Sequence, residues 1–197
     1  MPKGIPLTTE HLERRRQEIF SASVHLFLVK GFQETSMREI AAAAGMGKST
    51  IYDYFKTKDE ILLSLIEDDV DDLNRQVRII TDQSLPAVER LQQVMHTYLK
   101  YLLSKKAIFF KLNTEVQRLA LQSQQRVQLK RHELQDMLSS LIKDAIQEGS
   151  FRPVNPLLAT RTILALLTPA AFTTRPTDTA EQMMDDAFDI FLRGVQA

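Results

Sequence analysis

Residues 35–62 read TSMREIAAAAGMGKSTIYDYFKTKDEIL, and the central part, AAAAGMGKST at 41–50, has two possible interpretations. In the first it is a loose phosphate-binding loop, in which Gly47, Lys48 and Ser49 would cradle a nucleotide. In the second it is the end of one short helix, a tight turn at Gly45 and the start of another helix. The residues on either side of the turn decide between the two.

The residues before the turn favour the helical interpretation. Ser36-Met37-Arg38-Glu39 has the spacing of a capping box, in which Ser36 and Glu39 satisfy each other's backbone amides at a helix start. A phosphate loop instead follows a buried strand, and no stretch of this chain has the alternation that predicts a strand. We therefore interpret the phosphate-loop match as a coincidence and expect a helix-turn-helix, with Gly45 in the left-handed conformation of the turn.

The second helix of this motif separates apolar from polar residues. Ile51 and Phe55 are four residues apart, so they share a face that is expected to turn toward the core. The remaining positions form an outer face that would meet the major groove of DNA: Lys48, Ser49, Thr50, Tyr52 and Asp53.

Composition and periodicity describe the rest of the chain. Helical periodicity covers most of the 197 residues, which predicts an all-α protein of about nine helices, including separate helices after Pro86 and over 108–121. The chain has no cysteine, which excludes disulfides and suits a reducing cytosol. Neither a signal peptide nor an apolar run long enough to span a membrane is expected.

The charge distribution is uneven although the net charge is zero. Residues 1–58 carry nine basic and six acidic side chains, and residues 59–197 carry 16 basic and 19 acidic ones. A basic N-terminal part on an acidic body is expected when only the N-terminal part meets a polyanion such as DNA.

At this point the sequence resembles the DNA-binding signature of the TetR family of bacterial regulators. The resemblance rests on Lys30-Gly31-Phe32 at the end of the first helix and on the motif itself: Thr35, Ser36, Arg38, Ile40, Ala41, Gly45, Lys48, Tyr52, Tyr54, Phe55 and Lys58. The stretch EGSFRPVNPLLATRTILALL at 148–167 is similar to the entry into the family's dimerisation helices.

The resemblance implies a DNA-binding domain at 1–58 and a helical effector-binding and dimerisation domain at 59–197. It further implies a cytoplasmic homodimeric repressor that binds palindromic double-stranded DNA, is released by a small-molecule effector and uses no cofactor. A helical interaction protein with little DNA binding is the alternative.

The DNA contacts expected from the motif fall into two groups. Phosphate contacts are assigned to Thr35, Ser36, Lys48, Tyr52, Tyr54 and Lys58. Ser49 and Thr50 are expected to reach base edges, Arg38 could serve either purpose, and Gly47 stands where a serine often caps the recognition helix. Tyr54 could equally pack against the first helix, and Arg14, Arg15 and Arg16 form either a solvated face or contacts to flanking DNA. Asp53 would accept from cytosine N4 or, the interpretation we favour, turn aside to Lys56 or Arg38.

Residues 86–150 are expected to form a mostly apolar chamber for a lipophilic effector. The candidate pocket residues are Met95, His96, Tyr98, Tyr101, Phe109, Phe110, Asn113, Gln117, Met137 and Leu141. Aromatic residues at helical spacing could also be ordinary core.

The last two helices are expected to pair with their copies in a dimer. The predicted interface residues are Leu164, Leu167, Ala171, Met184, Phe188 and Phe191. The alternative is that these side chains pack only within their own subunit.

No motif predicts an enzyme. The acidic stretch EDDVDD at 67–72 lacks the glycine of a calcium loop and is expected to be a solvated helix face. The four histidines lack metal-site spacing, and no catalytic nucleophile or carboxylate pair emerges, so neither a catalytic nor a metal site is predicted.

Overall fold

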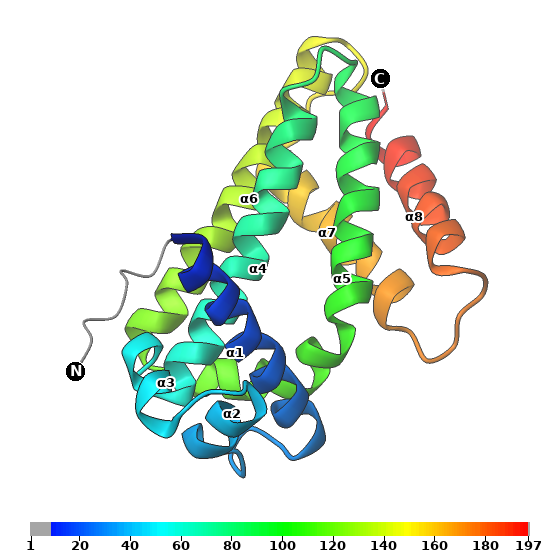
Figure 1. Ribbon diagram of the computed structural model, residues 1–197. Helices are drawn as coiled ribbons and strands as arrows, with labels where there is room; N and C mark the ends of the chain where they lie inside the picture. Colours follow the sequence, from blue (N-terminus) through cyan, green and yellow to red (C-terminus); the bar gives the residue numbers. More distant parts are fainter. Residues whose placement is uncertain (1–8, 197) are drawn as a thin grey trace. The chain divides into compact units, whose positions relative to one another are not determined.

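The computed structural model describes residues 9–196, without the side chains of Thr9 and Asn113. This part of the chain forms eight α-helices and no β-strand, which confirms the all-α fold class (Figure 1). The helices are α1 (Thr9–Val29), α2 (Met37–Ala43), α3 (Lys48–Tyr54), α4 (Lys58–Thr81), α5 (Ala87–Arg118), α6 (Leu121–Gln147), α7 (Pro156–Phe172) and α8 (Ala180–Val195).

Helix α5 accounts for the difference from the expected number of about nine. The periodicity predicts a separate helix over 108–121, whereas α5 runs continuously through Arg118. No glycine or proline interrupts α5, so nothing in the chain stops it earlier.

The chain divides into two compact units. We name the units after the roles that the sequence resemblance leads us to expect: the DNA-binding unit is the described part of Met1–Ile66 together with Ala107–Gln124, and the effector unit is Glu67–Lys106 with the described part of Gln125–Ala197. Residues 59–66 and 107–124, which were expected in the second domain, thus group with the first unit.

Aromatic and aliphatic side chains fill the core of the DNA-binding unit. The ring of Phe20 on α1 lies 5.6 Å from that of Phe55 after α3, and Phe27 lies 4.8 Å from Phe32. These pairs tie α1 to the end of α3 and to the loop before α2. The other apolar side chains of this unit that are at most 1% exposed include Ile19, Ile40, Ala41, Ile51 and Ile61.

The effector unit has a single apolar core built by α4 to α8. Its most deeply buried members include Leu91, Met95, Leu138, Ile142, Ile163 and Met184. Helix α7 starts where Asn155 Oδ1 accepts from the Leu158 amide at 2.9 Å, and α8 starts where Thr179 Oγ1 accepts from Gln182 at 3.2 Å. Side-chain caps of this kind fix the first turn of a helix.

The acidic stretch at 67–72 is not a solvated face, and that expectation is wrong. Glu67 is only 7% exposed, and three carboxylates of α4 form ion pairs with basic residues of α5 and α6. The pairs are Glu67–Arg126 at 2.7 Å, Asp69–Lys105 at 2.6 Å and Asp71–Lys130 at 2.6 Å. The stretch therefore joins helices within the effector unit.

Candidate nucleic-acid interface

Helices α2 and α3 form the helix-turn-helix that the sequence predicts. Ser36 Oγ accepts from the Glu39 amide at 3.3 Å, and the Ser36 amide donates to Glu39 Oε2 at 2.9 Å, which confirms the capping box. Gly45 has a φ of +65°, the left-handed conformation expected for the turn. Gly47 precedes α3 and, unlike the serine that often stands at this position, provides no side-chain cap.

The outer face of α3 is exposed while its inner face is buried. Ile51 is 0% exposed and Phe55 is 1% exposed, so both anchor α3 in the core. The residues predicted to meet DNA are accessible: Arg38 on α2, Gly47, and Lys48, Ser49, Thr50 and Tyr52 on α3. Tyr54 is half-buried, which fits the alternative in which part of its ring packs inside the protein.

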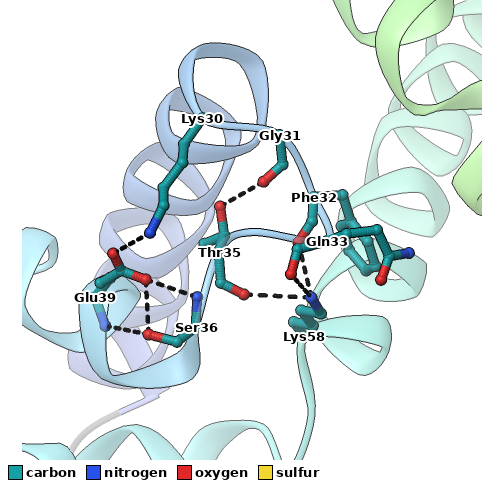
Figure 2. A network of polar contacts seen from close by, with 8 residues as sticks. All are labelled: Lys30, Gly31, Phe32, Gln33, Thr35, Ser36, Glu39 and Lys58. Carbon is teal, nitrogen blue, oxygen red and sulfur yellow. Dashed lines mark hydrogen bonds and ion pairs between the residues drawn. The ribbon is translucent and has the colours of Figure 1, made fainter.

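Thr35 and Lys58 do not offer the phosphate contacts assigned to them. Thr35 is 2% exposed, and its Oγ1 donates to the Gly31 carbonyl at 2.7 Å. Lys58 Nζ donates to the carbonyls of Phe32, Gln33 and Thr35, at 2.8, 2.9 and 3.3 Å (Figure 2). Because an ammonium group has three N–H donors, these bonds use its whole capacity. The structure thus corrects both assignments.

Ser36 and Lys30 are also engaged within the protein. Ser36 Oγ donates to Glu39 Oε2 at 2.7 Å, and Lys30 Nζ pairs with the other oxygen of Glu39 (Figure 2). Hydrogen bonds from Lys30, and next from Ser36, lower the pKa of Glu39 to about 2. The carboxylate is therefore fully ionised at neutral pH and holds the start of α2 to the end of α1.

The three arginines of α1 do not form an open basic face. Arg15 pairs with Glu18 at 2.7 Å, and Arg14 approaches the same carboxylate at 3.8 Å. The Arg16 guanidinium lies over the rings of Phe20 and Phe55, 5.3 and 5.4 Å from their centroids. Arg16 therefore stabilises the contact between α1 and α3.

Few cations remain for DNA. Among the described residues of α2 and α3, Arg38 and Lys48 are exposed and make no hydrogen bond or ion pair within the chain. Lys56 Nζ donates to the Tyr52 carbonyl. Asp53 is exposed and pairs with neither Lys56 nor Arg38, so the contact that we favoured for Asp53 is absent and its carboxylate stays on the outer face.

The predicted pocket residues fall in both units. Met95 and Leu141 are buried in the core of the effector unit, and Tyr98, Tyr101 and Met137 pack against that core with partial exposure. His96 Nε2 lies 3.4 Å from Asp185 of α8. Phe109, Phe110 and Gln117 belong to the DNA-binding unit, where Phe110 is 64% exposed. The side chain of Asn113 lies outside the described residues.

Most of the predicted dimer residues are core of their own subunit. Leu167, Ala171, Met184, Phe188 and Phe191 are at most 4% exposed within one chain, so they pack mainly inside their own subunit, and only Leu164 is partly exposed. The outer surface of α7 and α8 instead carries Leu158 and Ile190, each 64% exposed. They line a groove of about 330 Å³ between the two helices. The sequence does contain one signal for Leu158 and Ile190. Both are apolar residues that lie outside the main apolar stripe of their helix, and such residues can mark a second apolar face.

The fold and this surface define a helix-turn-helix transcriptional regulator. Residues 19–65 match the family of bacterial regulatory proteins called the tetR family, and residues 84–195 match the tetracyclin repressor-like C-terminal domain. The second match alone covers more than half of the chain. The protein therefore belongs to the TetR family.

Its relatives are regulators of transcription. The repressor KstR2 of Mycobacterium tuberculosis is 28% identical over 140 residues, 71% of this chain and 70% of KstR2. The uncharacterized regulator YhgD of Bacillus subtilis is 25% identical over 154 residues, 77% of this chain and 80% of YhgD. The crystal structure of AibR with isovaleryl coenzyme A and operator DNA has a TM-score of 0.72 at 25% identity, covering 89% of this chain and 97% of AibR. These likenesses speak against an enzymatic function.

Residues 9–196 contain neither a candidate membrane span nor a candidate metal site. No helix there has the length and apolar content needed to cross a membrane. No group of three or more histidine, aspartate or glutamate side chains in that range could hold a metal ion.

Proposed function

We propose that this protein is a ligand-responsive repressor that binds a palindromic operator as a homodimer and leaves it when a lipophilic effector binds. The observation that carries the proposal is the outer face of α3, where Lys48, Ser49, Thr50 and Tyr52 are exposed on a helix anchored by Ile51. A regulator of this kind acts on the chromosome, so we place it in the cytoplasm.

In this proposal the contacts divide by chemistry. Lys48 and Arg38 bind phosphates, because they are exposed cations without a partner in the chain. Ser49 and Thr50 read base edges, and Tyr52 supports the backbone contact. The carboxylate of Asp53 can accept a hydrogen bond in the major groove only from a donor such as cytosine N4.

We assign the dimer interface to the outer face of α7 and α8. Leu158 and Ile190 are apolar, largely exposed and adjacent to a groove, which is the surface that a second copy would cover. Ala165 and Gly194 also face outward and would let two helices approach closely. The buried residues named from the sequence then support this surface from behind.

For the effector we propose an acyl thioester of coenzyme A. AibR was solved with isovaleryl coenzyme A and operator DNA together, and it is similar to this chain over nearly its whole length. Tyr98, Tyr101 and Met137 offer an apolar wall at the edge of the effector unit's core, and the two tyrosine rings stack at 6.3 Å. Burial raises the pKa of Tyr101 to about 12, so its hydroxyl remains a neutral donor.

The test has two stages. Sheared genomic DNA is captured by the purified protein at near-physiological salt and sequenced, and the proposal expects one enriched palindrome with half-sites about one helical turn apart or somewhat more. Isovaleryl-CoA, stearoyl-CoA and coenzyme A alone are then titrated into the complex with that DNA. Release by an acyl-CoA but not by coenzyme A supports the effector class. Absence of any enriched DNA, also after refolding without ligand, would leave a helical interaction protein as the better description.

A further inference from the structure

The loop between α1 and α2, residues 30–36, presents several of its carbonyl groups to a single side chain. Gly31 turns the chain with a φ of +99°, and the carbonyls of Phe32, Gln33 and Thr35 then converge on Lys58 Nζ (Figure 2). The Phe32 carbonyl also accepts from the Thr35 amide at 3.3 Å. For Gln33 and Thr35, Lys58 is the donor that the structure provides.

The position of Lys58 in the chain makes this arrangement informative. Lys58 is the first residue of α4, where the helix dipole disfavours a positive charge. Three carbonyl oxygens and the face of the Phe32 ring, whose centroid is 4.7 Å from Nζ, offset that effect. The charge is thus held inside the DNA-binding unit.

We propose that Lys58 is a positioning residue for DNA binding: it fixes the loop before α2, and through that loop α2 and α3, without touching DNA. The proposal rests on the function proposed above. Thr35, one of the three acceptors, directly precedes the capping residue Ser36, and α2 packs against both α1 and α3. A shift of the loop would therefore move the recognition helix.

A second lysine braces the opposite side of the same loop. Lys30, at the end of α1, pairs with Glu39 of α2, as described above. Lys30 therefore holds α2 to the end of α1, and Lys58 holds the loop before α2 to the start of α4 (Figure 2). Loss of Lys58 leaves one brace in place, so the unit is expected to fold but with its loop and α2 loosened.

Salt dependence separates a positioning lysine from one that contacts phosphate. Each phosphate neutralised by a cation changes the slope of log affinity against log salt by about 0.9, so a contact made by both subunits of a dimer changes it by about 1.8. Lys58→Met is expected to weaken binding to the enriched DNA at least tenfold and to leave the wild-type slope unchanged. A slope that is less steep than the wild-type slope by about 1.8 would show a phosphate contact and overturn the proposal.

Lys58→Arg gives an independent answer. A phosphate contact would survive this change, since arginine binds phosphate at least as well as lysine. A planar guanidinium cannot replace an ammonium surrounded by three carbonyls, so the proposal expects weaker binding. Wild-type affinity in Lys58→Arg would overturn it.

Ile19→Val is the control for general destabilisation. Ile19 is fully buried in the same unit, and the structure gives it no part in the loop. If the two variants lose the same thermal stability, the proposal expects Lys58→Met to bind DNA more weakly than Ile19→Val. An equal loss of affinity in the two variants would mean that Lys58 matters only for folding.

Hydrogen exchange tests the brace without DNA. The amides of residues 33–40 should exchange at least tenfold faster in Lys58→Met than in the wild type and Ile19→Val. Unchanged exchange would overturn the proposal. If the wild type binds no duplex, the proposed function fails, whereas this measurement still decides on the brace.

Discussion

Replacing Lys48 by methionine tests how many DNA phosphates this protein neutralises. Lys48 and Arg38 are the exposed, unpaired cations among the described residues of α2 and α3, whereas Lys30, Lys56 and Lys58 are bonded within the chain. A dimer that uses Lys48 and Arg38 neutralises about four phosphates, so the slope of log affinity against log salt should be about −3.6. Raising salt from about 50 to about 200 mM would then weaken binding about 150-fold.

The variant should halve this dependence. Lys48→Met leaves about two neutralised phosphates per dimer, a slope of about −1.8 and a loss of about 12-fold over the same range of salt. At fixed salt, the loss of affinity should be about 1–3 kcal/mol. Fluorescence anisotropy with a labelled operator duplex, repeated at five salt concentrations, measures both quantities.

A matched control is available on α6. Lys143 is exposed and makes no hydrogen bond or ion pair within the chain, so Lys143→Met is the same chemical change in the effector unit. It should leave the slope at its wild-type value. A slope near −9 for the wild-type protein, the value expected if all five cations contacted DNA, would refute the estimate of about four phosphate contacts. An unchanged slope in Lys48→Met would refute it as well.

Three further predictions concern stability and assembly. Gly45→Ala should cost about 1–2 kcal/mol in chemical unfolding from backbone strain alone, since φ is +65° and no atom lies within 4 Å of the added carbon. Because hydrogen bonds depress the pKa of Glu39 from 4.5 to about 2, its contribution to stability is present above pH 4.5 and lost as pH falls toward 2. In Glu39→Gln, the unfolding free energy should depend less on pH between 4.5 and 2 than in the wild type. Ile190→Asp should yield folded monomers in sedimentation, whereas Met184→Ala should lower the unfolding free energy by about 2–5 kcal/mol.

The helix-turn-helix could be predicted because its determinants are local. A capping box acts over three residues, and the glycine that permits the turn stands where the turn occurs. Ile51 and Phe55 likewise mark the buried face of α3 by their spacing. Each of these features is visible in a window of a few residues.

The role of Lys58 could not be predicted in this way. Its acceptors Phe32, Gln33 and Thr35 lie 23 to 26 residues earlier in the chain, and a carbonyl group has no sequence signature. A lysine at the start of a helix beside a DNA-binding motif has the same sequence pattern whether it contacts phosphate or a loop. Only the path of the loop distinguishes the two.

The C-terminal helices show a different limit. Periodicity correctly found an apolar stripe on α7 and α8, but a stripe is expected both for a core and for an interface. Met184 and Phe188 turned out to be core, while Ile190, one helical face away, is exposed. A helix that is buried on one side and meets a partner on another carries two apolar faces, and the larger one dominates the pattern.

A small number of phosphate contacts would affect how the protein is regulated. If about four phosphate contacts support the dimer on DNA, each subunit supplies about half of the electrostatic attraction, and neither half-site alone would hold the protein at physiological salt. Affinity then depends on both recognition helices fitting their grooves together. An effector that prefers the spacing of the released state tenfold weakens operator binding by the same factor, because coupling between two ligands is reciprocal. Under the proposed function, the bonding of Lys30, Lys56 and Lys58 within the chain would therefore make the dimer easier to release from its operator.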